Sequence, residues 1–456
     1  MSQKAIHITG VVILAVLCFL YFEFNTTLYT NIYHNEYTYI HSFMVIFFLI
    51  YAIAIAKNPT NIFQPLHIFG IFYLCIFFIT PLALINANEA DCLGVNIMQS
   101  SVYATILVLL AFLFFVIGYT LIKTPKKIPN IKALDPLKNR KLLKLSYISF
   151  CVLSIINIGI LVKSGFSLSF LLSLGNGSSS IKGLAGNMLF LINISYCMLV
   201  PWLLICSLSE KKWPKIISSY ILFVIFFAYG WRFIIYIMAI AYSILYFRLK
   251  NKKPSFKFVI SLIGILLIIS VIMGSVRNNI RSGQSANFEG VNKDNIAYTL
   301  QSNFDIYKTF YGIVDKYPSQ YDFWYGEAVF VSPIIMWVPR FIWPSKPKGS
   351  EYPLTISMQN ALGKDVIEKA AMSSPNLTEY YLDFGWLGII ICSFALGIIS
   401  KKMMINYYSQ NIYDIIIYAL FCGFLIQLIN RGYLAQLITL LGFLYLPLFF
   451  IKKYFK

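Results

Sequence analysis

Apolar stretches of close to 20 residues recur along the chain and are separated by shorter polar or basic segments. A helix rises about 1.5 Å per residue, so about 20 residues cross the roughly 30 Å hydrocarbon core of a bilayer. A segment in lipid has to be helical, because its backbone polar groups need internal partners. The pattern predicts an all-α polytopic membrane protein with about twelve transmembrane helices and one long extracytoplasmic loop. The predicted spans are residues 6–23, 38–56, 66–86, 98–122, 145–162, 186–208, 216–229, 232–247, 258–276, 385–400, 413–429 and 433–450.

Composition and charge fit this interpretation. Hydrophobic residues make up 59% of the chain and charged residues 12%, against roughly 45–50% and 25% in soluble domains. The net charge of +19 would suggest a nucleic-acid partner in a soluble protein, so its distribution matters. With the N-terminus in the cytoplasm, the predicted cytoplasmic segments hold 23 of the 37 Lys and Arg residues, opposed only by Asp135, Glu210 and Asp414. This is the positive-inside pattern, so we expect no nucleic acid and a cytoplasmic C-terminus.

The chain divides into three parts. Residues 1–276 carry helices 1–9, residues 277–384 form the extracytoplasmic (periplasmic) loop, and residues 385–456 carry helices 10–12. We call 277–384 the long segment. Within it, residues 327–343 are apolar but interrupted by proline, which favours a re-entrant or interfacial segment over a thirteenth span.

Two apolar stretches, 216–247 and 413–450, are too long for one span and have basic residues at both ends. The positive-inside rule therefore predicts a helical hairpin in each. Both predicted turns contain a glycine, which would permit the reversal, and an arginine, Arg232 in the first and Arg431 in the second. A cation near the membrane surface is costly without an anionic partner, so both are candidate binding residues. The structural alternative is that each arginine extends to lipid headgroups.

Further cations lie in the long segment. Arg277 and Arg281 are four residues apart, on one face if the preceding helix continues, and Arg340 and Lys346 lie among prolines and tryptophans. Guanidinium groups bind phosphate oxygens in pairs and keep their charge at any relevant pH. We therefore expect these residues to bind phosphate. For Arg277 and Arg281, a solvated helix end near headgroups is the alternative.

The carboxylates of the long segment include Glu327, Glu379 and Asp383. Glu379 and Asp383 are four apart, but Asn376 with Glu379 also fits a capping box. All histidines precede residue 70, so the long segment has none. Neither a Cys/His metal spacing nor a nucleotide-binding loop occurs in the sequence, and we expect no metal and no cofactor.

Several short motifs follow one another in the second half of the chain. They are YGWR (229–232), RNNIR (277–281), Val-Pro-x-x-x-Trp-Pro-x-Lys-Pro (338–347), SPNLTE (374–379), Phe-Gly-x-x-Gly (384–388) and Asn-Arg-Gly (430–432). In this order they resemble the Wzy-type oligosaccharide repeat-unit polymerases of bacterial surface polysaccharide synthesis, and the resemblance extends over about residues 216–433.

The resemblance implies a GT-C-like glycosyltransferase architecture and a metal-independent reaction at the outer leaflet of the bacterial inner membrane. A growing glycan would pass from undecaprenyl diphosphate to the non-reducing end of a new lipid-linked unit, in O-antigen or capsule-type polysaccharide synthesis. The arginines and Lys346 would bind the diphosphate, and Glu379, Asp383 or Glu327 would be the base. Membrane lipids, a chain-length regulator and a flippase are the implied partners.

Two alternatives remain open at this point. Ligases that transfer the finished glycan to another acceptor have a similar topology, but they commonly use a histidine in the long loop. A flippase for lipid-linked oligosaccharides would need a cationic cavity across the bilayer, whereas the predicted spans contain few charges.

Overall fold

Helices form the regular structure of the described residues, and no strand occurs among them. The structure is a computed structural model that describes residues 3–24, 32–58, 61–125, 128–132, 135–163, 193–229, 232–255, 257–259, 261–269, 304–338, 342–370 and 373–452. The all-helical fold class is confirmed for this part of the chain.

Each predicted span falls on a helix wherever it is described. Seven helical stretches are long and apolar enough to cross a membrane, namely His34–Lys57, Pro65–Asn86, Met98–Leu121, Pro136–Val162, Asn376–Tyr407, Ile412–Asn430 and Leu434–Ile451. Shorter apolar helices occupy Ile8–Leu20, Ile194–Leu208, Phe233–Leu249 and Lys257–Ile269. The polytopic membrane class is thus confirmed, whereas the count of twelve stays a prediction.

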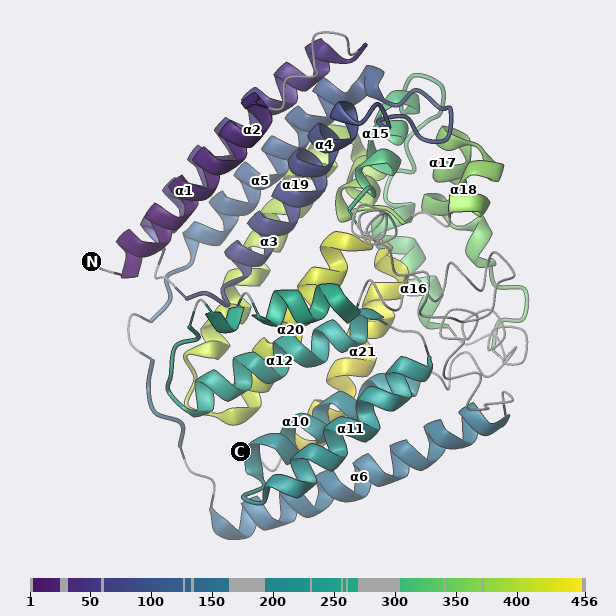
Figure 1. Ribbon diagram of the computed structural model, residues 1–456. Helices are drawn as coiled ribbons and strands as arrows, with labels where there is room; N and C mark the ends of the chain where they lie inside the picture. The colour runs from purple at the N-terminus through teal and green to yellow at the C-terminus, as the bar shows by residue number, and fades with distance from the viewer. Residues whose placement is uncertain are drawn as a thin grey trace, which may run out of the picture.

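The membrane helices lie in two groups, one toward the upper left of Figure 1 and one below it. The first group consists of α1 (Gln3–Phe24), α2 (His34–Lys57), α3 (Pro65–Leu74), α4 (Thr80–Asn86), α5 (Ser101–Leu121) and α19 (Asn376–Tyr407). The second consists of α6 (Pro136–Lys163), α10 (Leu199–Leu208), α11 (Lys212–Ala228), α12 (Arg232–Leu249), α20 (Ile412–Asn430) and α21 (Leu434–Ile451). The helix breaks between α11 and α12 and between α20 and α21 fall at the two predicted turns.

Helices α5 and α19 pack with their backbones in contact. A Cβ atom at Gly118 would overlap the carbonyl of Phe394, and one at Gly397 would overlap the carbonyl of Phe115. Small residues allow this close approach in membranes, where helix association depends on packing and hydrogen bonds. The contact therefore fixes α19 against the first helix group.

Contacts at one end of the bundle join segments that are all predicted to be cytoplasmic. The guanidinium of Arg248, 2% exposed, donates to the carbonyls of Tyr407 at 2.9 Å, Pro129 at 2.7 Å and Ser409 at 2.9 Å. The backbone N–H of Lys132 donates to Gln410 O at 3.0 Å. These segments lie on one side of the bundle.

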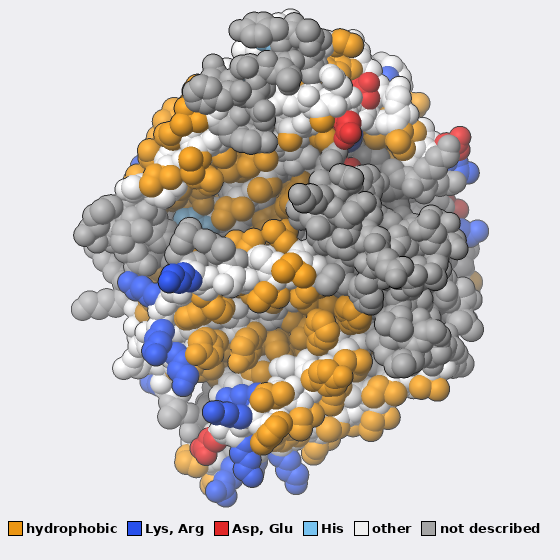
Figure 2. Space-filling model, viewed as in Figure 1, with side chains coloured by type: hydrophobic (Ala, Val, Ile, Leu, Met, Phe, Trp, Pro, Cys, Tyr) orange, Lys and Arg blue, Asp and Glu red, His pale blue; other side chains and the backbone are white. Residues whose placement is uncertain are grey.

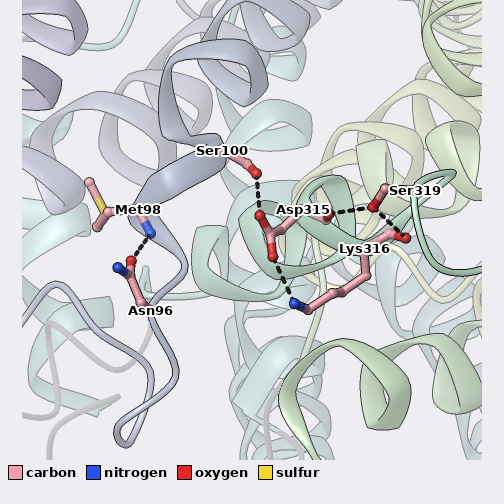
Figure 3. Close-up of polar contacts among 6 residues, drawn as sticks. All are labelled: Asn96, Met98, Ser100, Asp315, Lys316 and Ser319. Atoms are coloured by element: carbon pink, nitrogen blue, oxygen red, sulfur yellow. Dashed lines mark hydrogen bonds and ion pairs between the residues drawn. The ribbon is translucent and has the colours of Figure 1, made fainter.

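Contacts at the opposite end join the long segment to residues 87–97, which are also predicted to be extracytoplasmic. The hydroxyl of Ser100, just before α5, donates to Asp315 Oδ1 at 2.8 Å, and Lys316 pairs with the same carboxylate at 3.0 Å (Figure 3). Asp315 belongs to α15 (Tyr307–Lys316), on which Lys308 Nζ also donates to the carbonyls of Glu89 and Asp91. Residues 87–97 and α15 thus lie together at this end of the bundle.

Side-chain charge differs between the two ends. Figure 2 shows a broad apolar surface between them. Most visible Lys and Arg side chains gather at the lower left, around the ends of α6, α11 and α12, and most visible Asp and Glu side chains lie at the upper right. The visible face thus has the asymmetry that the positive-inside rule describes.

We predict that Gly397→Ala destabilises the protein by about 1–3 kcal/mol, because the new methyl group would overlap backbone that cannot move away freely. The matched control is Gly159→Ala in α6, where an added Cβ has nothing within 4 Å. Thermal unfolding of the two purified variants in detergent measures the difference. Equal midpoints would contradict backbone contact between α5 and α19.

Candidate active site

Two motifs that are distant in sequence meet at one backbone junction. The N–H of Gly432, in the turn between α20 and α21, donates to Ser374 O at 2.7 Å. A Cβ at Gly432 would overlap the backbone of Asn376, at the start of α19. We name this contact the Ser374–Gly432 junction. It places the Asn-Arg-Gly turn directly against the SPNLTE motif.

The role expected for this glycine needs correction. The sequence suggested that glycine permits the reversal of the chain, but the φ angle of Gly432 is not in the left-handed region. Glycine is required here because Asn376 leaves no space for a side chain.

Glu379 lies at the same junction and is 1% exposed. Its Oε2 accepts a hydrogen bond of 2.7 Å from the N–H of Leu434, the first residue of α21. A carboxylate in this position is stabilised by the helix dipole and by an N–H that has no partner within the helix. Glu379 therefore binds the N-terminus of a neighbouring helix. The alternative of an Asn376–Glu379 capping box is wrong, because the α19 N-terminus has no side-chain cap.

The second oxygen of Glu379 has no hydrogen-bond partner among the described residues. The same holds there for three other buried atoms around the junction: Asn376 Nδ2, Asn430 Oδ1 and the hydroxyl of Tyr433. Buried polar atoms are seldom left without a partner in a folded protein, and such a group can mark a functional site.

Asp383 has a different environment, although it lies only one helical turn from Glu379. Its Oδ1 accepts from the N–H of Ala328 at 3.0 Å, and its Oδ2 accepts from the N–H of Val329 at 2.7 Å. Both oxygens are thus engaged at the start of another helix, and the side chain is fully buried. This geometry suits Asp383 to position backbone.

The helix that Asp383 holds is the apolar part of the long segment. It consists of a π-helical turn, Glu327–Val331, followed by α16, Ser332–Trp337. We call Glu327–Trp337 the short apolar helix. Lys346, 8% exposed, donates from Nζ to the carbonyls of Met336 and Val338, both at 2.9 Å, at its other end. Two buried side chains of opposite charge therefore bind its two ends.

A kink separates Glu379 and Asp383 from the rest of α19. Phe384 and Gly385 have non-helical backbone angles, with Gly385 at φ 58°. A Cβ at Gly388 would overlap the carbonyl of Tyr380. The Phe-Gly-x-x-Gly motif thus forms a tight break, close to the predicted start of the tenth span at residue 385.

The other predicted site residues are placed as follows. Arg431 is exposed at the junction, next to Gly432, and Glu327 is exposed at the start of the short apolar helix. Arg232 is the first residue of α12, but its side chain is outside the described part of the structure, as are Arg277, Arg281 and Arg340. Within the described residues, no group of three His, Cys, Asp or Glu side chains could hold a metal ion.

The fold and the site together define a polytopic membrane protein with a buried carboxylate and an arginine turn at the end that carries its long hydrophilic segment. The sequence matches the family model described as O-antigen polysaccharide polymerase Wzy over residues 8–456, nearly the whole chain. The chain therefore belongs to this polymerase family, as the motif order predicts. Comparisons with curated proteins and with solved structures each gave no match.

Sequence reasoning missed three features of the site. Asn376 and Tyr433 were not proposed as site residues, although both stand inside the quoted motifs or next to them. The contact between Lys346 and two carbonyls also has no local signal, because the side chain reaches back ten residues. The position of Asn376 in the same motif as Glu379, three residues before it, is the one clue in the sequence.

We predict that Gly432→Ala abolishes polymer formation and lowers the thermal midpoint, because a methyl group cannot fit against Asn376 without opening the junction. Gly349→Ala, in the long segment, is the control, since an added Cβ at Gly349 has nothing within 4 Å. Electrophoresis of surface polysaccharide and immunoblotting of the membrane fraction measure activity and protein level. Normal polymer from a normal amount of Gly432→Ala protein would disprove the tight contact.

Proposed function

We propose that this protein polymerises undecaprenyl-diphosphate-linked oligosaccharide repeat units at the outer leaflet of the bacterial inner membrane. It has twelve spans in a GT-C-like arrangement, both termini in the cytoplasm, and the long segment outside. Family membership supports the polymerase activity. The charge distribution and the separate clustering of the two sets of loops support the orientation.

The observation that carries the proposal is the Ser374–Gly432 junction. There a buried carboxylate, one oxygen of which has no partner among the described residues, lies beside the turn that bears Arg431. Glu379 is the general base. It takes the proton of the acceptor hydroxyl while that oxygen forms a bond to the anomeric carbon of the donor glycan. The bond from this carbon to the phosphate oxygen breaks, and the lipid diphosphate leaves.

The cations supply the remaining chemistry. A diphosphate is a good leaving group once its developing charge is held, so fixed cations can replace a metal ion. Arg431 is exposed at the junction, and Arg232, Arg277, Arg281 and Arg340 complete the diphosphate site. Lys346 contributes by binding the C-terminal end of the short apolar helix, which keeps the positive charge of Lys346 near the diphosphate site. A flippase would supply the substrate, and a chain-length regulator would act on the product.

We predict that a strain lacking the protein accumulates surface lipid with a single repeat unit, because flipping and ligation continue without polymerisation. Electrophoresis of the polysaccharide measures this result. Long polymer retained on the lipid carrier would instead identify a ligase, and the absence of repeat units outside the membrane would identify a flippase. Complementation with alanine variants of the five arginines should restore only short chains, and wild-type lengths from all five would refute their role.

We predict that Glu379→Gln lowers the polymerisation rate by about 100-fold or more, because the amide still accepts from Leu434 but cannot take a proton. Asp383→Asn should instead destabilise the protein by about 1–3 kcal/mol, since one buried backbone N–H loses its acceptor. The exposed Glu327 provides the control variant, Glu327→Gln. Rates from purified protein, corrected for the folded fraction, separate the two roles. A large rate loss only in Glu327→Gln would transfer the base to that residue.

A further inference from the structure

The short apolar helix exposes a face of large apolar side chains. Ile334 is 70% exposed, Phe330 59% and Val331 45%. At about 1.5 Å per residue, the segment Glu327–Trp337 is about 16 Å long, which is too short to cross the hydrocarbon core. Its apolar face therefore belongs at one leaflet only.

The structure fixes this helix firmly. Asp383 binds its N-terminus and Lys346 its C-terminus, which matches the sign of the helix dipole at both ends. The Trp337 ring stacks on Phe443 of α21, with centroids 6.1 Å apart and planes at 14°. One face of the helix thus packs on α21. The backbone groups at the two ends of the helix, which lipid could not satisfy, have hydrogen-bond partners. The exposed face is held in a single position.

This face begins at the candidate active site. Asp383, which binds Ala328 and Val329, follows Glu379 by one helical turn on α19. The ring of Tyr352, whose hydroxyl contacts Met336 Sδ of the short apolar helix at 3.7 Å, lies 5.9 Å from the ring of Tyr433. The helix and the Ser374–Gly432 junction are therefore parts of one continuous unit.

We propose that the exposed face of Glu327–Trp337 is the docking surface for the polyprenyl chain of the lipid-linked substrate. The inference rests on the proposed function. The diphosphate is bonded directly to the first isoprene unit, so the chain has to leave the site over apolar surface that adjoins it. Within the described structure, the short apolar helix is such a surface, and it faces a single leaflet. Docking there orients the diphosphate toward Glu379 and Arg431.

The test compares two synthetic repeat-unit donors, one on undecaprenyl diphosphate and one on geranyl diphosphate. The full-length protein is assayed in phosphatidylethanolamine and phosphatidylglycerol vesicles. Ile334→Asn should raise KM for the undecaprenyl donor about tenfold, as expected for the loss of one apolar contact of this size. KM for the geranyl donor should change much less, because its two isoprene units cover less of this face than the undecaprenyl chain, and kcat for both donors should stay unchanged.

The control is Ile155→Asn on α6, because Ile155 is also 70% exposed. It should leave both KM values unchanged. Equal effects of the two variants, or equal effects on the two donors, would show that the face contacts only bulk lipid. Crosslinking of an Ile334→Cys variant into dimers would show a protein interface and also overturn the proposal. Failure of the wild-type protein to extend either donor would refute the proposed function itself.

Discussion

The site depends on one short stretch of helix, Asn376–Asp383, that binds two other helices by their N-termini. Glu379 accepts from the first residue of α21, and Asp383 accepts from the start of the short apolar helix. Hydrogen bonds from backbone N–H groups to a carboxylate are stronger than those between neutral groups, and the helix dipole adds to them. The relative positions of three segments therefore follow from two side chains four residues apart.

This stretch is in turn fixed to the membrane bundle. The break at Phe384 and Gly385 changes the chain direction without a loop, and Gly388 closes the break tightly against Tyr380. Beyond it, Gly397 packs α19 on the backbone of α5. At the far end of the bundle, Arg248 joins α12 to the C-terminal end of α19 and to the loop that contains Pro129 through their carbonyls. Rigid elements thus extend from that end of the bundle to the candidate base.

The sequence predicted the features that depend on the thickness of the bilayer and on the distribution of charge. Spans follow from the thickness of the hydrocarbon core, and both hairpins follow from the basic residues at their ends. Motif order also predicted that Asn-Arg-Gly and SPNLTE belong to one site. The hydrogen-bond partner of Glu379 could not be predicted, because its contact with Leu434 joins residues 55 positions apart. The reason why residue 432 is a glycine could not be predicted either. A glycine needed for a turn and a glycine needed for close packing look the same in a sequence.

The contrast between the two carboxylates explains how one turn of helix can serve structure and chemistry together. Asp383 uses both oxygens to hold backbone, so its removal costs stability. Glu379 uses one oxygen in the same manner and leaves the other without a partner in the described structure. A base held by a helix terminus needs little reorganisation during a reaction, and such preorganisation is what lowers a barrier. In the proposed reaction, the bond to Leu434 orients the second oxygen toward an acceptor hydroxyl while the arginines neutralise the diphosphate.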